Sequence, residues 1–345
     1  MVETLDSLTE RPISHESGIS LPTINDMPDA VSDVLALFRM RGEFVCESEA
    51  VAPWSIQFHR PGAHMHIVQD GFAWLKIDGE ETPVKVSPGQ LVLLPHGGAH
   101  VLSSDPVLRP ITIEDAIAED VTRENLLFHI GGPGVETRLI CARLYFSGVL
   151  ASRLASVLPK LIHIQPLATR RSEWLTVTSN LLANETRDSR PGAAIMIARL
   201  LDLLFIQAVR EWGATGPGER GWLSGLCDAQ IGRALSAMHE DPAKNWTVED
   251  LAEISKLSRS AFAARFTALV GEPPLRYLAV WRLDLAADQL RAGTKRIADI
   301  ARAAGYGSEA ALARAFKIRF GETPSAFRRG ASRRGEIKSI GPERT

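Results

Sequence analysis

The feature that most constrains the fold of this 345-residue chain is an internal repeat in its C-terminal third. From Ser258 onward, similar residues recur at a constant spacing of 50 residues. The matching pairs are Phe262 with Leu312, Phe266 with Phe316, Gly271 with Gly321, Glu272 with Glu322, and Pro274 with Pro324. A repeat of this length predicts two copies of one small supersecondary unit.

Each copy carries the signals of two short helices joined by a tight turn. Ser258 and Ser308 suit helix N-caps, because a serine hydroxyl accepts a hydrogen bond from a first-turn amide. Gly271 and Gly321 suit the left-handed position that ends a helix. Thr247-Val-Glu-Asp250 resembles a capping box at the first short helix. This pattern predicts two helix-turn-helix units, whose second helices enter the major groove of DNA.

The helical period indicates which side chains of each second helix face outward, at about 100° per residue. The expected DNA-facing residues are Arg259, Ser260, Ala263, Ala264 and Thr267 in the first copy, and Glu309, Ala310, Ala313, Arg314 and Lys317 in the second. Arg314 can make a bidentate contact to guanine, whereas the first copy offers mainly small side chains that read shape and methyl groups. Residues near or beyond the helix end are expected on phosphates: Lys317, Arg319, Arg328 and Arg329.

At these residues the chain resembles the AraC/XylS family of transcription regulators, over about residues 226–329. The resemblance rests on the stretches Leu251–Phe266, Gly271–Leu278, Ile300–Tyr306, Arg314–Lys317 and Phe320–Pro324. It implies that a linker helix from Pro274 to Arg291 holds the two recognition helices about one DNA turn apart. Ala264 stands where many members carry arginine, which implies weak base reading by the first unit.

Charge is distributed unevenly along the chain. Residues 1–225 contain 19 Lys and Arg against 27 Asp and Glu, a net charge of −8. Residues 226–345 contain 20 against 14, a net charge of +6. The C-terminal third is basic and the rest of the chain is acidic, which favours a polyanionic partner at the C-terminal end.

The hydrophobic pattern of residues 44–146 differs from that of the C-terminal third: short apolar or alternating runs are separated by turns. The runs are Trp54–Phe58, Phe72–Ile77, Gln90–Leu94 and Leu139–Phe146. Many strands at close spacing predict a β-barrel or sandwich. The expected fold class is therefore α+β and multidomain, with an N-terminal barrel and following helices, and an all-α C-terminal double helix-turn-helix domain.

Two short patterns in the barrel segment resemble the motifs of the cupin fold. Gly89, Pro95, Gly97 and His100 fit the second motif, and His64-x-His66 fits part of the first. In metal-binding cupins three histidines and a glutamate hold a divalent ion. Here the glutamate position carries Gln69 or Asp70, and we assign no metal, no cofactor and no catalytic residue.

The resemblance implies a cupin-type sensor over residues 44–212, with a small-molecule effector in the barrel. The expected lining residues of this pocket are His64, His66, Trp74 and His100. An ordinary core role for the same residues stays open.

The chain is expected to divide into six segments. These are a flexible arm at 1–28, the cupin-like sensor barrel at 29–150, a helical dimerisation or packing segment at 151–212, a glycine-rich linker at 213–225, the double helix-turn-helix domain at 226–330, and a basic tail at 331–345. Helices are expected at 151–158, 172–187 and 191–212. The broad apolar face of the last one packs on the barrel or on a partner chain, and both interpretations stay open.

These observations predict a cytoplasmic, sequence-specific DNA-binding transcription regulator controlled by a small molecule. The expected partners are double-stranded promoter DNA, the effector and a second copy of the chain, with RNA polymerase as a candidate. We expect no membrane partner, because Arg199 and Asp202 interrupt the longest apolar run, and no signal peptide. Two alternatives stay open: a metal-dependent cupin enzyme fused to a DNA-binding module, and a constitutive DNA-binding protein whose barrel only dimerises.

Overall fold

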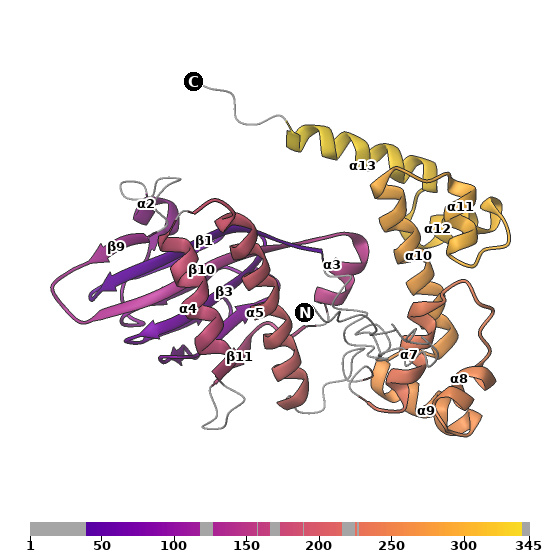
Figure 1. The fold of residues 1–345 in the computed structure, drawn as a ribbon, viewed down its shortest axis with the longest axis horizontal. Coiled ribbons are helices and arrows are strands. Elements are labelled where there is room, and N and C mark those ends of the chain that lie inside the picture. Colours follow the sequence, from indigo (N-terminus) through magenta and orange to yellow (C-terminus); the bar gives the residue numbers. More distant parts are fainter. Residues whose placement is uncertain are drawn as a thin grey trace, which may run out of the picture.

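The computed structural model describes residues 39–117, 127–156, 158–165, 173–188, 190–215, 225 and 228–339. A β-rich N-terminal part is followed by a helical C-terminal part, as Figure 1 shows. The expected arm at 1–28 and most of the expected linker lie outside the described residues. The fold class predicted from the sequence is confirmed.

Two sheets form the N-terminal part. One has six strands in the order β11-β6-β3-β10-β1-β9, and the other has five in the order β5-β4-β7-β2-β8. The strands are β1 Arg39–Val51, β2 Ser55–Phe58, β3 Ala63–Asp70, β4 Ala73–Ile77, β5 Val84–Val86, β6 Leu91–Leu94, β7 His100–Ser103, β8 Ile111–Thr112, β9 Leu127–Gly131, β10 Glu136–Ser147 and β11 Ile162–Ile164. No ladder among the described strands joins the two sheets, so the cupin-like fold is described by two packed sheets without a closed hydrogen-bonded barrel.

Strand alternation gives the six-stranded sheet two buried faces. On β3, His64, His66 and Val68 point toward the five-stranded sheet, where Val68 joins a core with Ile56 and Leu102. The intervening residues of β3 point to the opposite face and join a second core. A sheet covered on both faces needs apolar residues at consecutive positions, which explains the nearly continuous burial of this strand.

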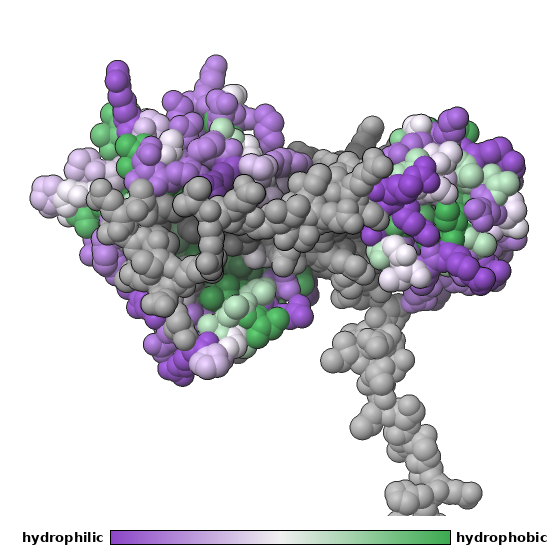
Figure 2. Space-filling model, turned by 90° about the horizontal axis from the view of Figure 1, so that it is seen from above, coloured by the Kyte–Doolittle hydropathy of each residue, from purple (hydrophilic) through white to green (hydrophobic). Residues whose placement is uncertain are grey.

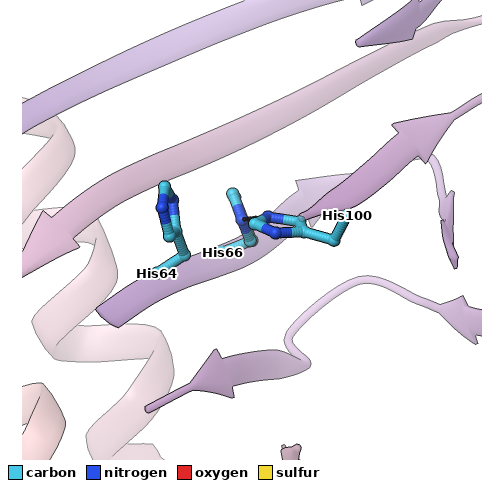
Figure 3. Close-up of side chains that lie close together, drawn as sticks. All are labelled: His64, His66 and His100. Carbon is cyan, nitrogen blue, oxygen red and sulfur yellow. Dashed lines mark hydrogen bonds between the residues drawn. The ribbon is translucent and has the colours of Figure 1, made fainter. Parts of the chain in front are cut away.

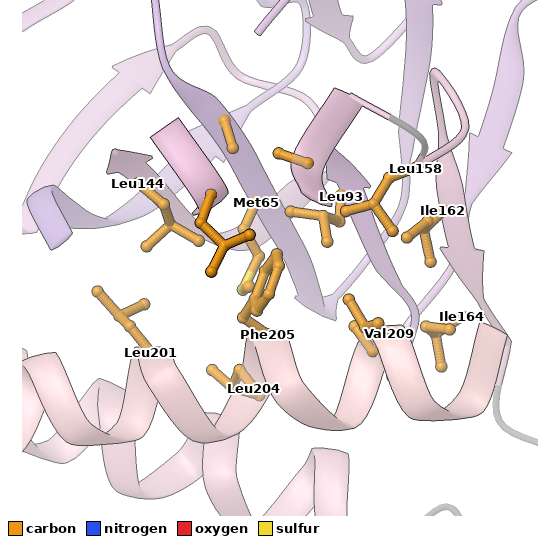
Figure 4. Packing of buried hydrophobic residues seen from close by; sticks show 14 of the residues in the cluster. Met65, Leu93, Leu144, Leu158, Ile162, Ile164, Leu201, Leu204, Phe205 and Val209 are labelled. Atoms are coloured by element: carbon orange, nitrogen blue, oxygen red, sulfur yellow. The ribbon is translucent and has the colours of Figure 1, made fainter. Parts of the chain in front are cut away.

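Helices cover the second face of the six-stranded sheet (Figure 1). They are α4, Glu173–Arg187, and α5, Ala193–Thr215, which pack on each other, while the short α2, Ile113–Ile117, and α3, Val149–Ser156, lie elsewhere. Figure 4 shows Leu201, Leu204, Phe205 and Val209 of α5 against Met65, Leu93, Leu144, Leu158, Ile162 and Ile164. The apolar face of α5 therefore packs inside the chain, and each fully buried side chain contributes about 1.5–3 kcal/mol.

The C-terminal part consists of seven helices among the described residues. They are α7 Ile231–Glu240, α8 Val248–Ile254, α9 Arg259–Val270, α10 Pro274–Ala292, α11 Ile297–Ala303, α12 Glu309–Phe320 and α13 Pro324–Ser339. The pairs α8–α9 and α11–α12 are the two repeat copies, and α10 joins them. Helix α13 continues to Ser339, into the segment expected as a tail. No helix among the described residues is long and apolar enough to span a bilayer.

The capping signals of the repeat are confirmed. Ser258 Oγ accepts the Ala261 amide at 3.3 Å, and Ser308 Oγ accepts the Ala311 amide at 3.1 Å. The glycines that follow α9 and α12 have φ of 92° and 78°, a left-handed conformation that costs glycine no steric clash. Thr247 begins α8 with a full capping box. Local sequence therefore determines where each helix of the two units begins and ends.

Candidate DNA interface and effector cavity

The first recognition helix, α9, exposes the side chains expected on DNA. Phe262 and Phe266 are buried and anchor the helix, so the opposite face is free of the core. The exposed residues are Arg259, Ser260, Ala264 and Thr267, and Ala263 is half-buried. Arg259 is held by Glu249 at 2.8 Å, and the Thr267 hydroxyl donates to the Ala263 carbonyl at 2.8 Å. The polar groups of this face are thus engaged within the protein.

The second recognition helix, α12, has the same architecture, and its face carries two basic side chains and one acidic side chain. Leu312 and Phe316 are fully buried. Glu309, Ala310, Arg314 and Lys317 are exposed, and Ala313 is half-buried. The structure therefore brings each set of expected residues onto one exposed helix face. Seen from above, the surface of the helical part is predominantly hydrophilic (Figure 2).

Arg319, which we expected to contact a DNA phosphate, instead pairs with a carboxylate of the protein. Its Nε and Nη2 donate to Asp284 Oδ1 at 2.9 and 2.7 Å, and the Asp284 side chain is completely buried. Because a buried carboxylate is costly unless it is paired, the guanidinium of Arg319, whose side chain is 29% exposed, stabilises Asp284. Arg328 also bonds within the protein, donating to the Lys295 carbonyl at 2.7 Å. The sequence showed the charges of these arginines, but their partners are 33 and 35 residues away.

The helix α10 is tied to both units by polar contacts as well as by packing. Arg282 donates to the carbonyls of Pro242 and Lys244, at 2.6 and 2.7 Å, just before α8. Asp284, two residues further along, holds Arg319 of α12. The two recognition helices are therefore positioned on one rigid support, as docking on two successive grooves requires.

In the N-terminal part, the two sheets bring three histidines together (Figure 3). His64 and His66 come from β3, and His100 comes from β7 of the other sheet. Ring nitrogens of the three residues lie within 4.8 Å of one another. His66 Nε2 is 2.8 Å from His100 Nε2, and Phe58 stacks on the His100 ring with centroids 5.0 Å apart.

The environment of these rings favours the neutral imidazole. Burial lowers the pKa of all three histidines, and for His100 the pKa is about 4. His100 and His64 also lower the pKa of His66, and His64 lowers the pKa of His100, because like charges repel. Carbonyl acceptors fix two tautomers, because His64 Nε2 donates to the Arg60 carbonyl and His100 Nδ1 to the Gly98 carbonyl.

This donor set fits a divalent transition metal such as zinc. Neutral imidazoles are its usual ligands, and His66 Nδ1 is buried without a hydrogen-bond partner among the described residues. Asp70 is not a fourth ligand, because its side chain is 66% exposed and pairs with Arg138 at 3.3 Å. The side-chain oxygen of Gln69 is buried without a hydrogen-bond partner among the described residues. A bound ion would act as a Lewis acid and hold a ligand at an open position.

A small cavity that is partly open to solvent adjoins the histidines. Its lining includes Phe58, Arg60, His64, His66, Glu114 and Arg143. Arg60 and Glu114 form an ion pair at this site, a contact that sequence reasoning missed because the two residues are far apart in the chain. His100 lies behind these residues, stacked on Phe58.

Trp74, which we expected in the pocket, is not one of the residues that line this cavity. Its neighbours Ala73 and Leu75 are fully buried, and alternation along β4 turns Trp74 to the other face. There the ammonium of Lys85 lies 6.0 Å from its ring centre. Lys76, two residues further along β4 and exposed on the same face, is the sequence signal that predicts this orientation.

Comparison with known proteins agrees with both parts. A cupin family model matches residues 29–214, and a helix-turn-helix domain model matches residues 251–330. An AraC-like transcription regulator of Streptomyces lividans is 36% identical over 87% of this chain and 98% of its own length. The regulator AlkR of Acinetobacter baylyi is 34% identical over 76% and 86%. The DNA-bound domain of AdpA is 27% identical over 31% of this chain and 96% of that domain, with a TM-score of 0.30.

A cupin domain joined to paired helix-turn-helix units defines a DNA-binding transcription regulator. Relatives of nearly the same length carry that function in their names. The chain belongs to the AraC family of transcription regulators, in the branch with an N-terminal cupin domain.

Proposed function

We propose that the regulator reads DNA bases mainly through α12 and docks by shape through α9. The support is the contrast between the two faces: Arg314 and Lys317 are exposed on α12, whereas Arg259 on α9 is paired with Glu249. An arginine at the centre of a recognition helix suits the two acceptors of guanine. We infer that the remaining expected residues of both faces, given above, approach the grooves with them.

Selection of bound sequences from genomic fragments tests this proposal, with Arg314→Ala in parallel. The matched control is Arg302→Ala, because Arg302 is exposed on α11 and pairs only with the surface residue Asp299 in the contacts described. We expect an enriched site that Arg314→Ala loses and Arg302→Ala keeps. Equal enrichment by all three proteins would refute base reading by Arg314.

A small molecule in the cavity between the sheets is the proposed controlling signal. The observation that carries this proposal is the cavity lined by Arg60, Arg143, His64 and His66. Basic side chains beside this partly open cavity favour an anionic or hydrogen-bonding compound. Binding would shift the population between arrangements of the two domains, and so change DNA affinity.

Thermal-shift screening of small carboxylic acids and aromatic compounds tests this part, with Cys141→Leu as a cavity-narrowing variant, because Cys141 lines the cavity and belongs to the core between the sheets. A stabilising compound should lose its effect in Cys141→Leu and should change operator affinity in the wild type. A compound that binds the cavity without changing operator affinity would contradict control by this site.

We also propose that the regulator is a homodimer through the outer face of α4 and α5. Five large apolar residues there are 42–57% exposed: Val177, Leu181, Ile195, Met196 and Leu203. Arg199 and Asp202 lie on the same helix, so a twofold-related copy presents opposite charges to each. Sedimentation of Leu203→Glu against the wild type tests this; a wild-type monomer would refute it.

A metal-dependent enzyme is the second candidate function, and the three-histidine cluster favours it. It requires stoichiometric metal in the purified protein that is lost in His66→Ala, and turnover of a bound compound. The relatives support regulation rather than catalysis. A cytoplasmic location and contact with RNA polymerase belong to the regulator proposal.

A further inference from the structure

The helix α3 connects the cavity domain to the helix α10. It begins at Val149, directly after β10, whose residues Cys141 and Arg143 line the cavity. Figure 1 shows α3 between the sheets and α10, and α3 contacts both β10 and α10. One short stretch of chain therefore runs from the cavity wall to the support of the two recognition helices.

A carboxylate from α10 caps this helix. Asp288 Oδ1 accepts the Val149 amide at 2.6 Å, and Asp288 Oδ2 accepts the Leu150 amide at 3.3 Å. The first amides of a helix have no partner within the helix and carry partial positive charge, so an anionic acceptor stabilises them. The α3 residues themselves provide no acidic side chain in the first turn. The N-cap of a sensor helix is thus supplied by the DNA-binding domain.

The backbone just before α3 leaves room for the Asp288 carboxylate. Gly148 has φ of 111°, and a Cβ at that position would lie 2.9 Å from Asp288 Oδ2. Apolar packing accompanies the polar contact: Val149 packs on the core of the second helix-turn-helix unit, and Leu150 is buried. The Asp288 carboxylate therefore lies close to the start of α3, and apolar packing of Val149 and Leu150 holds the two helices together there.

Asp288 lies one helical turn beyond Asp284, which holds Arg319 of α12. Together with Arg282, these residues tie α10 to the first unit, to the second unit and to the sensor. A rotation or shift of α10 that accompanies docking on DNA would change the geometry of the Asp288 contact, because the contact spans only hydrogen-bond distance.

We propose that the Asp288 cap on α3 is the coupling contact through which the cavity domain and the DNA-binding domain influence each other. This inference rests on the proposed control of DNA binding by the cavity. A change at β10 alters the start of α3 and hence α10, and DNA on the recognition helices acts along the same path in reverse.

Hydrogen exchange at the Val149 and Leu150 amides of the full chain reads the cap directly. The variants are Asp288→Ala, which removes both acceptors, and Asp288→Asn, which keeps one. Glu240→Ala is the matched control, because it removes an exposed carboxylate from the same domain. The probe is operator DNA recovered by genomic selection, and no effector is needed. Failure to find an effector therefore leaves this test intact.

We expect Asp288→Ala to accelerate exchange at the two amides by about tenfold, the size typical of a lost carboxylate cap. Asp288→Asn should restore part of the protection. In the wild type, operator DNA should change exchange at these amides by at least about threefold, and in Asp288→Ala it should have no effect. Coupling between two sites is reciprocal. Asp288→Ala should therefore change operator Kd by the factor by which operator DNA changes amide exchange in the wild type. If DNA strengthens the cap, the variant should bind DNA more weakly, and if DNA weakens the cap, the variant should bind more tightly.

Two results would overturn the proposal. Equal amide exchange in Asp288→Ala and the wild type would show that the cap does not form in solution. The second result has two parts: saturating operator DNA leaves exchange at these amides unchanged in the wild type, and Asp288→Ala binds the operator with the same Kd as Glu240→Ala. Together they would show that the cap only stabilises the structure.

Discussion

Replacing Arg319 by alanine is the sharpest test of how the second helix-turn-helix unit is held together. The variant leaves the Asp284 carboxylate, which is completely buried, without the two hydrogen bonds that Arg319 donates at 2.9 and 2.7 Å. Removing one partner of a fully buried pair typically costs about 3–5 kcal/mol, and the cost here should lie below that range because the Arg319 side chain is 29% exposed. The lost stability should be concentrated in α12 and the helices that pack on it.

Amide hydrogen exchange in the full chain measures this loss locally, since a two-domain protein has no single free energy of unfolding. We expect exchange in α11 and α12 of Arg319→Ala to accelerate by at least about tenfold. Arg302→Ala is the control, because it breaks an ion pair whose arginine is 81% exposed, and such pairs contribute at most about 1 kcal/mol.

A double substitution separates the charge effect from lost packing. Asp284→Leu combined with Arg319→Met replaces both ions by apolar side chains, and it should recover most of the protection that Arg319→Ala loses. If Arg319→Ala changes exchange in α12 no more than Arg302→Ala does, the buried pair does not support this unit. The same conclusion holds if the double substitution is as unstable as Arg319→Ala.

Three further outcomes follow from local features of the fold. Ser308→Ala should destabilise α12 by about 1 kcal/mol, measured by amide exchange, whereas a loss in α9 alone would contradict it. Gly97→Ala should prevent folding of the sensor, measured by circular dichroism, because its Cβ would lie 1.7 Å from the Gly62 carbonyl oxygen. In chelator-treated protein, thermal stability should be full above about pH 6.5 and fall toward pH 4, because the lowered pKa of His100, about 4, lets the unfolded chain bind the proton first. A melting temperature independent of pH would refute this.

The helix-turn-helix units could be predicted almost completely from sequence because their signals are local. A serine three residues before a free amide determines where α9 and α12 begin, and a glycine determines where each ends. The buried positions Phe262 and Phe316 follow from the period of the same short segments. Each of these features depends on fewer than five neighbouring residues, so one sequence suffices.

The parts that escaped prediction depend on pairs distant in the chain. Arg319 carries a charge that suits phosphate, and only the fold reveals the carboxylate 35 residues earlier that it neutralises. Asp288 reaches the start of α3 across 139 residues. Trp74 is an exception, because its face is decided by neighbours on the same strand: Ala73 and Leu75 are buried and Lys76 is exposed. Histidines at 64, 66 and 100 were grouped correctly because a motif resemblance supplied the long-range information.

The carboxylate of Asp288 also determines which piece of this regulator can be exchanged with another. The glycines between residues 213 and 221 suggest a natural junction for chimeras of sensors and DNA-binding domains. A chimera joined there would place a foreign helix against α3 and leave the Val149 and Leu150 amides uncapped, unless that helix carries an acid at the matching position. One residue inserted between Asp284 and Asp288 would turn the carboxylate by about 100° around its helix, away from α3. The transplantable module is therefore the DNA-binding domain together with α3, so the functional boundary lies inside the sensor and upstream of the linker.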